Sequence, residues 1–80
     1  MWFAYVLRSQ KNGRLYTGST DDVGRRLHEH RRRKNRYTRH AGPFKLVYVE
    51  VLTGRLAARR RELALKKGQG RAFLKATLGH

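Results

Sequence analysis

Two apolar segments near the start of the chain flank a tight-turn signal, and this arrangement most restricts the possible fold. Trp2 to Arg8 is aromatic and β-branched with a period of two, which is typical of a strand. Asn12-Gly13 follows, and both residue types tolerate the positive φ angles of a two-residue hairpin turn. Leu15 to Gly18 is expected to be the returning strand. The chain is therefore predicted to begin with an antiparallel β-hairpin.

The register of this hairpin decides which side chains share a face of the sheet. A two-residue turn at Asn12-Gly13 would pair Ser9 with Tyr16. Paired residues share a face, and so do residues two apart in one strand. The predicted shared face holds Tyr5, Leu7, Ser9, Tyr16 and Gly18.

A helix is expected to follow the hairpin directly. A hydroxyl cap and first-turn acids at residues 19–22 favour a helix over about residues 21–31 that buries Val23, Leu27 and part of His30. Arg26 and His30 are four residues apart, so they are predicted to lie on one face of this helix.

The second half of the chain is predicted to add one strand and two helices. Lys45 to Leu52 has the pattern of a strand, and Thr53 is expected to cap a helix over residues 54–67 that Gly68 ends. A short final helix is expected over residues 71–78. The predicted fold is a single α/β (α+β) domain over residues 1–80. It has a small three-stranded antiparallel or mixed sheet flanked by helices, in the order β-β-α-β-α-α.

The composition points to a polyanionic partner. Lys and Arg number 20 against 5 Asp plus Glu, a net charge of +15. Nucleic acid, an anionic membrane surface and an acidic protein all fit this charge, and the excess of arginine favours nucleic acid because arginine forms bidentate contacts with phosphate. The chain has no cysteine, which excludes disulfides and thiolate metal sites. Without a membrane-length apolar run or a basic leader, we expect a cytoplasmic protein with no membrane partner.

Two triplets and two later segments carry a family resemblance. Phe3-Ala4-Tyr5 and Tyr16-Thr17-Gly18 are similar to the signature triplets of the GIY-YIG nuclease superfamily. Residues 22–30 resemble its first helix with an Arg and a His, and residues 61–66 resemble its segment with a metal-binding Glu. The similarity is greatest to the small stand-alone bacterial members of the UPF0213 type. In the first triplet, Phe and Ala replace Gly and Ile, and the Asn that follows the Glu in larger members is missing here.

The resemblance implies a metal-dependent endonuclease that hydrolyses phosphodiester bonds in DNA, in a structure-specific or repair-related role. It assigns catalysis to Tyr5 and Tyr16, which would orient or deprotonate the attacking water, and to Arg26, which would hold the scissile phosphate. His30 would bond a tyrosine hydroxyl or help move a proton. Glu62 would bind Mg²⁺, or another divalent cation such as Mn²⁺. We further expect the cationic surroundings to lower a tyrosine pKa and favour the phenolate.

A basic segment and several other residues are expected to contact nucleic acid, which the resemblance implies is DNA. The segment 31–39 holds an embedded tyrosine, which suits backbone tracking with a stacking platform. The full set of expected nucleic-acid-binding residues is Gly18, Arg25, Arg31, Arg32, Arg33, Lys34, Arg36, Tyr37, Arg39 and Lys66.

Each candidate also has a structural interpretation. The tyrosines are equally typical of strand aromatics, and Arg26 has the spacing of an ion pair with Asp22. Glu62 has the spacing of a surface ion pair with Lys66, and Glu50 is the second candidate for a metal ligand. A zinc site is disfavoured, because His28 and His30 cannot share a helix face.

Two other functions remain open on the sequence. One is a non-cleaving nucleic-acid-binding module on the same scaffold, and the other is an RNA- or ribosome-associated basic protein. The first would be free to lose Glu62 or Tyr16. The second predicts a preference for RNA and no metal dependence.

Overall fold

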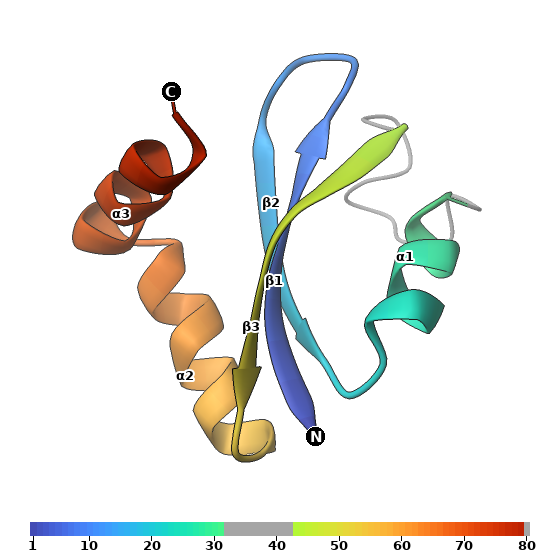
Figure 1. Cartoon of the computed structure of the whole chain (residues 1–80), viewed down its shortest axis with the longest axis vertical. Coiled ribbons are helices and arrows are strands. Elements are labelled where there is room, and N and C mark those ends of the chain that lie inside the picture. Colours follow the sequence, from blue (N-terminus) through green and yellow to red (C-terminus); the bar gives the residue numbers. More distant parts are fainter. Residues whose placement is uncertain (32–42, 80) are drawn as a thin grey trace.

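A three-stranded sheet with helices on both faces forms the domain (Figure 1). The computed structural model describes residues 1–31 and 43–79. In chain order the elements are β1 (Trp2–Ser9), β2 (Leu15–Thr20), α1 (Val23–Arg31), β3 (Phe44–Leu52), α2 (Arg55–Leu65) and α3 (Gly68–Leu78). The predicted α/β class and the order β-β-α-β-α-α are confirmed, and both strand pairs are antiparallel. No helix in these ranges is long and apolar enough to cross a membrane.

The central strand β1 supplies both halves of the core. Side chains alternate across a strand, and residues 4–7 are all buried, so β1 contributes apolar groups to both faces. Ala4 and Val6 pack with Leu65 and Leu74 beneath α2 and α3. On the other face, a second cluster packs against α1 and holds Tyr5, Leu7 and Phe44, with Tyr16, Leu27 and Leu46 at its margin. The sheet order β2-β1-β3 leaves β2 and β3 as edges.

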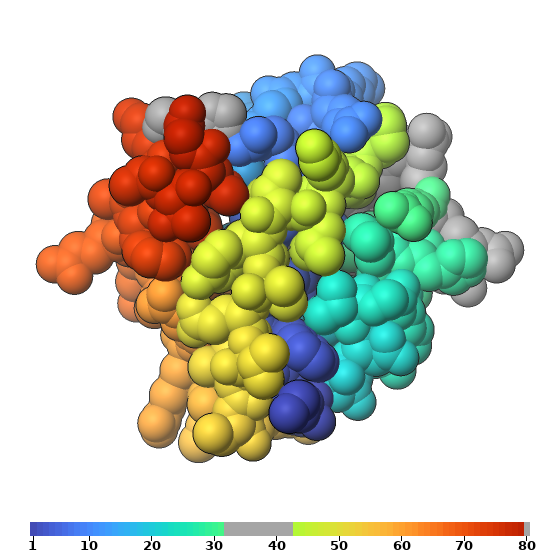
Figure 2. All heavy atoms as spheres, viewed as in Figure 1, coloured from blue at the N-terminus to red at the C-terminus, as the bar shows by residue number. Residues whose placement is uncertain are grey.

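An irregularity in the pairing of β3 changes which of its side chains face each of the two core clusters. The pairing of β1 with β3 shifts between Val6 and Leu7, where Val6 pairs with Tyr48 but Leu7 pairs with Leu46. The consecutive residues Val47 and Tyr48 both pack on the α2 and α3 side as a result. Figure 2 shows β3 at the surface between α1 on one side and α2 with α3 on the other.

The hairpin has a longer loop than the sequence predicts. Tyr5 pairs with Gly18 and Leu7 with Tyr16, and the Ser9 amide donates to the Arg14 carbonyl oxygen at 2.9 Å. The predicted pairing of Ser9 with Tyr16 is therefore wrong by two residues. The Ser9 hydroxyl accepts hydrogen bonds from the amides of residues 11 and 12, which stabilises a wider turn. A shift of two residues preserves the face, so Tyr5, Leu7, Tyr16 and Gly18 still lie together as predicted.

The helix boundaries differ from the predictions at the caps. α1 begins at Val23 because the Asp22 carboxylate accepts the Arg25 amide at 3.0 Å. The N-cap of α2 is Gly54 with no side-chain hydrogen bond, so the predicted cap by Thr53 is wrong. Gly68 does not end α2, which stops at Leu65; it begins α3, which is three residues longer at its start than predicted.

A close contact between α2 and α3 generates the first testable prediction. A Cβ atom added at Gly70 would clash with the Ala64 carbonyl oxygen and lie 2.6 Å from the Leu65 Cα atom. Backbone atoms cannot give way, so Gly70→Ala is expected to destabilise the domain by about 1–3 kcal/mol in urea unfolding. Gly68→Ala is the matched control, since a Cβ there meets nothing within 4 Å. Equal stability of the two variants would contradict the prediction.

Candidate active site

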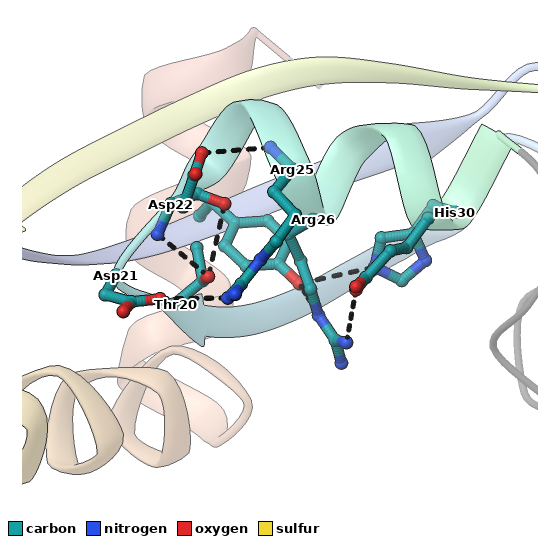
Figure 3. A network of polar contacts seen from close by, with 8 residues as sticks. Thr20, Asp21, Asp22, Arg25, Arg26 and His30 are labelled. Carbon is teal, nitrogen blue, oxygen red and sulfur yellow. Dashed lines mark hydrogen bonds and ion pairs between the residues drawn. The ribbon is translucent and has the colours of Figure 1, made fainter.

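Two side chains from α1 lie within hydrogen-bonding distance of the Tyr5 hydroxyl. Arg26 Nε donates to it at 3.3 Å, and His30 Nε2 lies 3.3 Å away. Arg26 and His30 project from successive turns of the helix toward the same side (Figure 3), which confirms their predicted shared face. The cap at Asp22 fixes where the helix begins after β2. The structure thus brings together three of the predicted catalytic residues.

Gly18 allows the tyrosine ring to reach the edge strand. Tyr5 and Gly18 are paired neighbours in the sheet, and a Cβ atom at residue 18 would lie 2.5 Å from the Tyr5 hydroxyl oxygen. Real Cβ atoms do not come this close. The missing side chain therefore makes room for the hydroxyl over β2, which is a common role of a glycine within a strand.

Tyr16 lies on the same face but in a different environment. Its ring packs edge-on against Phe44 with centroids 5.4 Å apart. Within residues 1–31 and 43–79 its hydroxyl makes no hydrogen bond, although the residue is half-buried and lines the same cleft as Tyr5. The two tyrosines therefore share a face and a cleft, but only Tyr5 is tied to Arg26 and His30.

Glu62 approaches from the opposite face of the sheet. Ser19 pairs with Ala4 and points toward α2, where its hydroxyl donates to Glu62 Oε1 at 2.7 Å. Lys66 Nζ donates to Oε2 at 2.9 Å, and Arg59 Nη1 contacts both oxygens at 3.3 Å. Glu62 is only 5% exposed. The predicted ion pair with Lys66 is present, but the Glu62 carboxylate is buried, so the pair is not a surface ion pair.

The remaining structural alternatives are resolved by other contacts. Arg26 Nη1 pairs with Glu29 at 3.1 Å, and the alternative ion pair with Asp22 is not formed. Glu50 accepts from the Tyr48 hydroxyl at 2.6 Å and pairs with Arg61 at 3.0 Å. Glu50 is not among the residues that line the cleft.

One cleft joins the two halves of the candidate site around the β2 edge. It has a volume of about 1240 Å³. Tyr5, Tyr16, Arg26 and His30 line it from the α1 side, and Glu62 lines it from α2. All five residues predicted for catalysis and metal binding thus face a common space. Gly18 and Ser19 form the part of β2 that separates them.

Burial sets the protonation of this site. Burial raises the pKa of Tyr5 above 10.0, and the Arg26 guanidinium opposes the effect without cancelling it. The expected lowering of a tyrosine pKa is therefore wrong for Tyr5. Burial and the Arg26 charge lower the pKa of His30 below 6.5. Burial favours a raised pKa at Glu62, but hydrogen bonds from Lys66 and Ser19 and the charge of Arg59 outweigh it, so the pKa lies below 4.5.

The predicted nucleic-acid-binding residues fall into separate places. Arg25 pairs with Asp21 at 2.9 Å on the exposed side of α1, and Lys66 is bound to Glu62. Arg31 is exposed at the end of α1. Arg32, Arg33, Lys34, Arg36, Tyr37 and Arg39 lie outside the described residues.

Four further cations line the cleft and were missed in the sequence: Arg14 before β2, Arg59 on α2, and Arg71 and Lys75 on α3. Arg59 pairs with Glu62, whereas within the described parts of the chain the other three have no acidic partner. The spacing of Arg71 and Lys75 places both on one helix face, which was a readable signal, but only the fold turns that face toward β2.

The chemistry of Glu62 is compatible with a divalent cation that has a single protein ligand. No group of three or more His, Cys, Asp or Glu side chains able to hold a metal exists among residues 1–31 and 43–79. A single carboxylate with water and substrate phosphate is nevertheless a usual way to bind Mg²⁺. Glu62 is a hard oxygen donor held ionised in the cleft, so the donor chemistry suits Mg²⁺ or Mn²⁺.

Comparison with known proteins identifies the protein family to which this chain belongs. A sequence model described as the GIY-YIG catalytic domain matches residues 1–75. The chain belongs to the GIY-YIG family, which is a family of nuclease domains.

The chain is similar to several bacterial UPF0213 proteins. One from Desulfotalea psychrophila is 41% identical over 68 residues, covering 82% of this chain and 61% of the relative. One from Nitratidesulfovibrio vulgaris is 43% identical over 68 residues, covering 84% and 61%. One from Streptococcus agalactiae is 41% identical over 73 residues, covering 90% and 82%. The chain thus spans about three fifths of the length of the first two, at 61%. No solved structure matches.

The buried histidine generates a prediction about pH. Because the folded pKa of His30 lies below its ordinary 6.5, the unfolded chain binds this proton first as the pH falls. The contribution of His30 to stability is present above 6.5 and is lost as the pH falls toward the folded pKa. Urea unfolding between about pH 7.5 and about pH 5.5 should show this loss, and His30→Gln should reduce it. The same pH dependence in both proteins would contradict the assignment.

Proposed function

We propose that this domain is an endonuclease that hydrolyses phosphodiester bonds in DNA with a divalent cation, Mg²⁺ or Mn²⁺, at Glu62. The observation that carries the proposal is the bonding of the Tyr5 hydroxyl to both Arg26 and His30, in the cleft that Glu62 also lines. Membership of a nuclease family supports it. The five residues are of the types that activate water, hold a phosphate and bind a hard metal ion.

The hydrogen bonds define a path for one proton. Arg26 donates to the Tyr5 oxygen, and in the His30 tautomer proposed here Nε2 carries no proton and accepts the hydroxyl proton of Tyr5. His30 is neutral at pH 7 because its pKa is lowered, and it accepts that proton. The raised pKa of Tyr5 means that no resident phenolate serves as the base. In the proposed step, Tyr5 takes a proton from the attacking water while its own proton passes to His30.

The positive groups in the cleft take the remaining roles. The Arg26 side chain is 40% exposed, so its guanidinium is accessible to the scissile phosphate. A divalent cation on Glu62 would stabilise the charge that develops on the phosphate oxygens. Tyr16, which lines the cleft from β2, is proposed to orient the water. Structure-specific cleavage and a part in DNA repair belong to this proposal and are tested by the choice of substrates below.

A non-cleaving binding module is the second candidate, and one observation favours it. Both Glu62 oxygens already have cationic partners in Lys66 and Arg59. If these contacts persist with nucleic acid bound, Glu62 would act only as a counter-ion. Binding would then be salt-sensitive and independent of metal.

Removing the carboxylate charge at residue 62 separates the two candidates. Glu62→Gln keeps the size of the side chain but removes the metal ligand, so cleavage should fall more than about 100-fold. DNA binding should survive or tighten, because a negative charge leaves the cleft. The assay uses labelled duplex, nicked, forked and single-stranded DNA with an RNA control, in Mg²⁺ and in EDTA. Glu50→Gln is the control, since it removes the same charge outside the cleft.

The outcomes of that assay are distinct. Metal-dependent cuts that vanish in Glu62→Gln but persist in Glu50→Gln support the nuclease. Binding without cuts on every DNA substrate supports the binding module, and preferential binding of the RNA control supports an RNA-associated protein.

The cations on α3 generate a prediction about affinity. Arg71 and Lys75 line the cleft beyond Glu62 and are proposed to contact phosphates that flank the scissile bond. The double variant Arg71→Gln, Lys75→Gln should weaken DNA binding and reduce the slope of log affinity against log salt by about 0.9 for each lost contact. The control is Lys45→Gln, Arg60→Gln, which removes two exposed cations that do not line the cleft. Equal slopes for the two double variants would place the nucleic acid elsewhere.

A further inference from the structure

The Glu62 carboxylate is buried against β2 on one side and contacts two cationic side chains on the other. Its side chain is 7% exposed, and the Ser19 hydroxyl fixes Oε1 from β2 at 2.7 Å. The side chains of Lys66 and Arg59 are 48% and 61% exposed, so these cations cover the carboxylate toward solvent. Both cations line the same cleft as Glu62.

We propose that Lys66, assisted by Arg59, is a resident counter-ion that must leave Glu62 before a divalent cation binds, and that nucleic acid phosphate draws it away. This inference rests on the proposed function of Glu62 as the metal ligand. It assigns Lys66 a role as a positioning residue in a cation exchange. Metal binding and nucleic-acid binding are then coupled at one carboxylate.

The local charge balance explains why the two ligands depend on each other. One carboxylate and two cations, −1 and +2, leave this group at +1 before any metal arrives. A divalent cation would raise it to +3 if both cations stayed in place. In a chain of net charge +15 that repulsion is relieved only by moving the cations or adding a polyanion. A phosphate strand in the cleft does both.

The geometry lets Lys66 make this move without a change of fold. Lys66 is the C-cap of α2, and its side chain lines the same cleft as Arg71 and Lys75. A lysine ammonium sits on a flexible four-carbon stem and redirects its donors easily. Arg59 contacts both oxygens at the longer distance of 3.3 Å, whereas Lys66 is at 2.9 Å. Lys66 is therefore the principal competitor for the metal.

Coupling of this kind is reciprocal. If duplex DNA raises the affinity for a divalent cation by some factor, the cation raises the affinity for DNA by the same factor. Removing the Lys66 charge should free the Glu62 carboxylate from its principal counter-ion. The divalent cation should then bind more tightly without DNA, and the addition of DNA should increase its affinity less than in the wild type.

The test measures Mn²⁺ binding directly on the full chain, by titration followed through the electron paramagnetic resonance signal of free Mn²⁺. It compares wild type, Lys66→Gln, Lys67→Gln and Glu62→Gln, each alone and with a phosphorothioate duplex that resists cleavage. Lys67→Gln is the matched control: Lys67 is the next residue, is exposed, and does not line the cleft. Without DNA, Lys66→Gln should bind Mn²⁺ at least about 5-fold more tightly than wild type, at the lower end of usual coupling. Lys67→Gln should stay close to wild type.

The outcomes that would overturn the inference differ from those that overturn the proposed function. Equal gains in Lys66→Gln and Lys67→Gln would show a general charge effect and remove the role of Lys66. So would a duplex enhancement that is the same in Lys66→Gln as in wild type. Both results leave Glu62 as the metal ligand. If Glu62→Gln binds Mn²⁺ as wild type does with the duplex present, the metal assignment falls, and the exchange falls with it.

Discussion

The close approach of the Tyr5 hydroxyl to the backbone at Gly18 is the contact on which the candidate site depends. It places a phenol from the buried central strand at the edge strand, where Arg26 and His30 reach it from α1. A side chain at residue 18 would fill the space that the hydroxyl occupies. The same contact removes the phenol from water, and this burial raises its pKa. The contact with Gly18 thus accounts for both the position of the Tyr5 hydroxyl and its protonated state.

Acidic residues are so few that each has a defined role. Asp22 caps α1, Asp21 pairs with Arg25, Glu29 with Arg26, Glu50 with Arg61 and Glu62 with Lys66. The remaining positive charge has no acid to balance it within the described residues, and part of it lines the cleft. Self-repulsion of this kind disfavours the compact state and favours binding of a polyanion. The part of this charge that lines the cleft would be neutralised by a bound polyanion.

Local patterns in the sequence predicted most of the fold. Period-two apolar segments gave the strands, and the spacing of Arg26 and His30 correctly predicted their shared helix face. The hairpin register was wrong because the Ser9 hydroxyl stabilises a wider turn, a contact that the Asn12-Gly13 signal does not reveal. The face assignment survived since the error was two residues. Gly68 was misread as a helix end because a glycine after a helical pattern does not tell whether another helix starts there.

The candidate site was less predictable, because it depends on tertiary distances. Glu62, Lys66 and Ser19 are visible in the sequence. The burial of the Glu62 carboxylate and its hydrogen bond from the Ser19 hydroxyl are not, because both depend on the tertiary structure. Burial also reversed the expected direction of the Tyr5 pKa, since desolvation outweighed the nearby guanidinium. Charges visible in a sequence predict the sign of a field, whereas a pKa depends on how far the group is removed from water.

The order of strands is itself a requirement of the site. Tyr5 and Glu62 come from opposite faces of the sheet, and only a strand at the edge lets groups from both faces meet in one cleft. If β2 had another strand beside it, the sheet would separate the phenol from the carboxylate. An edge strand normally exposes hydrogen-bonding groups that invite aggregation. Here Arg14, Arg59 and Arg71 line the cleft that adjoins this edge, and positive charges near an edge disfavour its pairing with another strand.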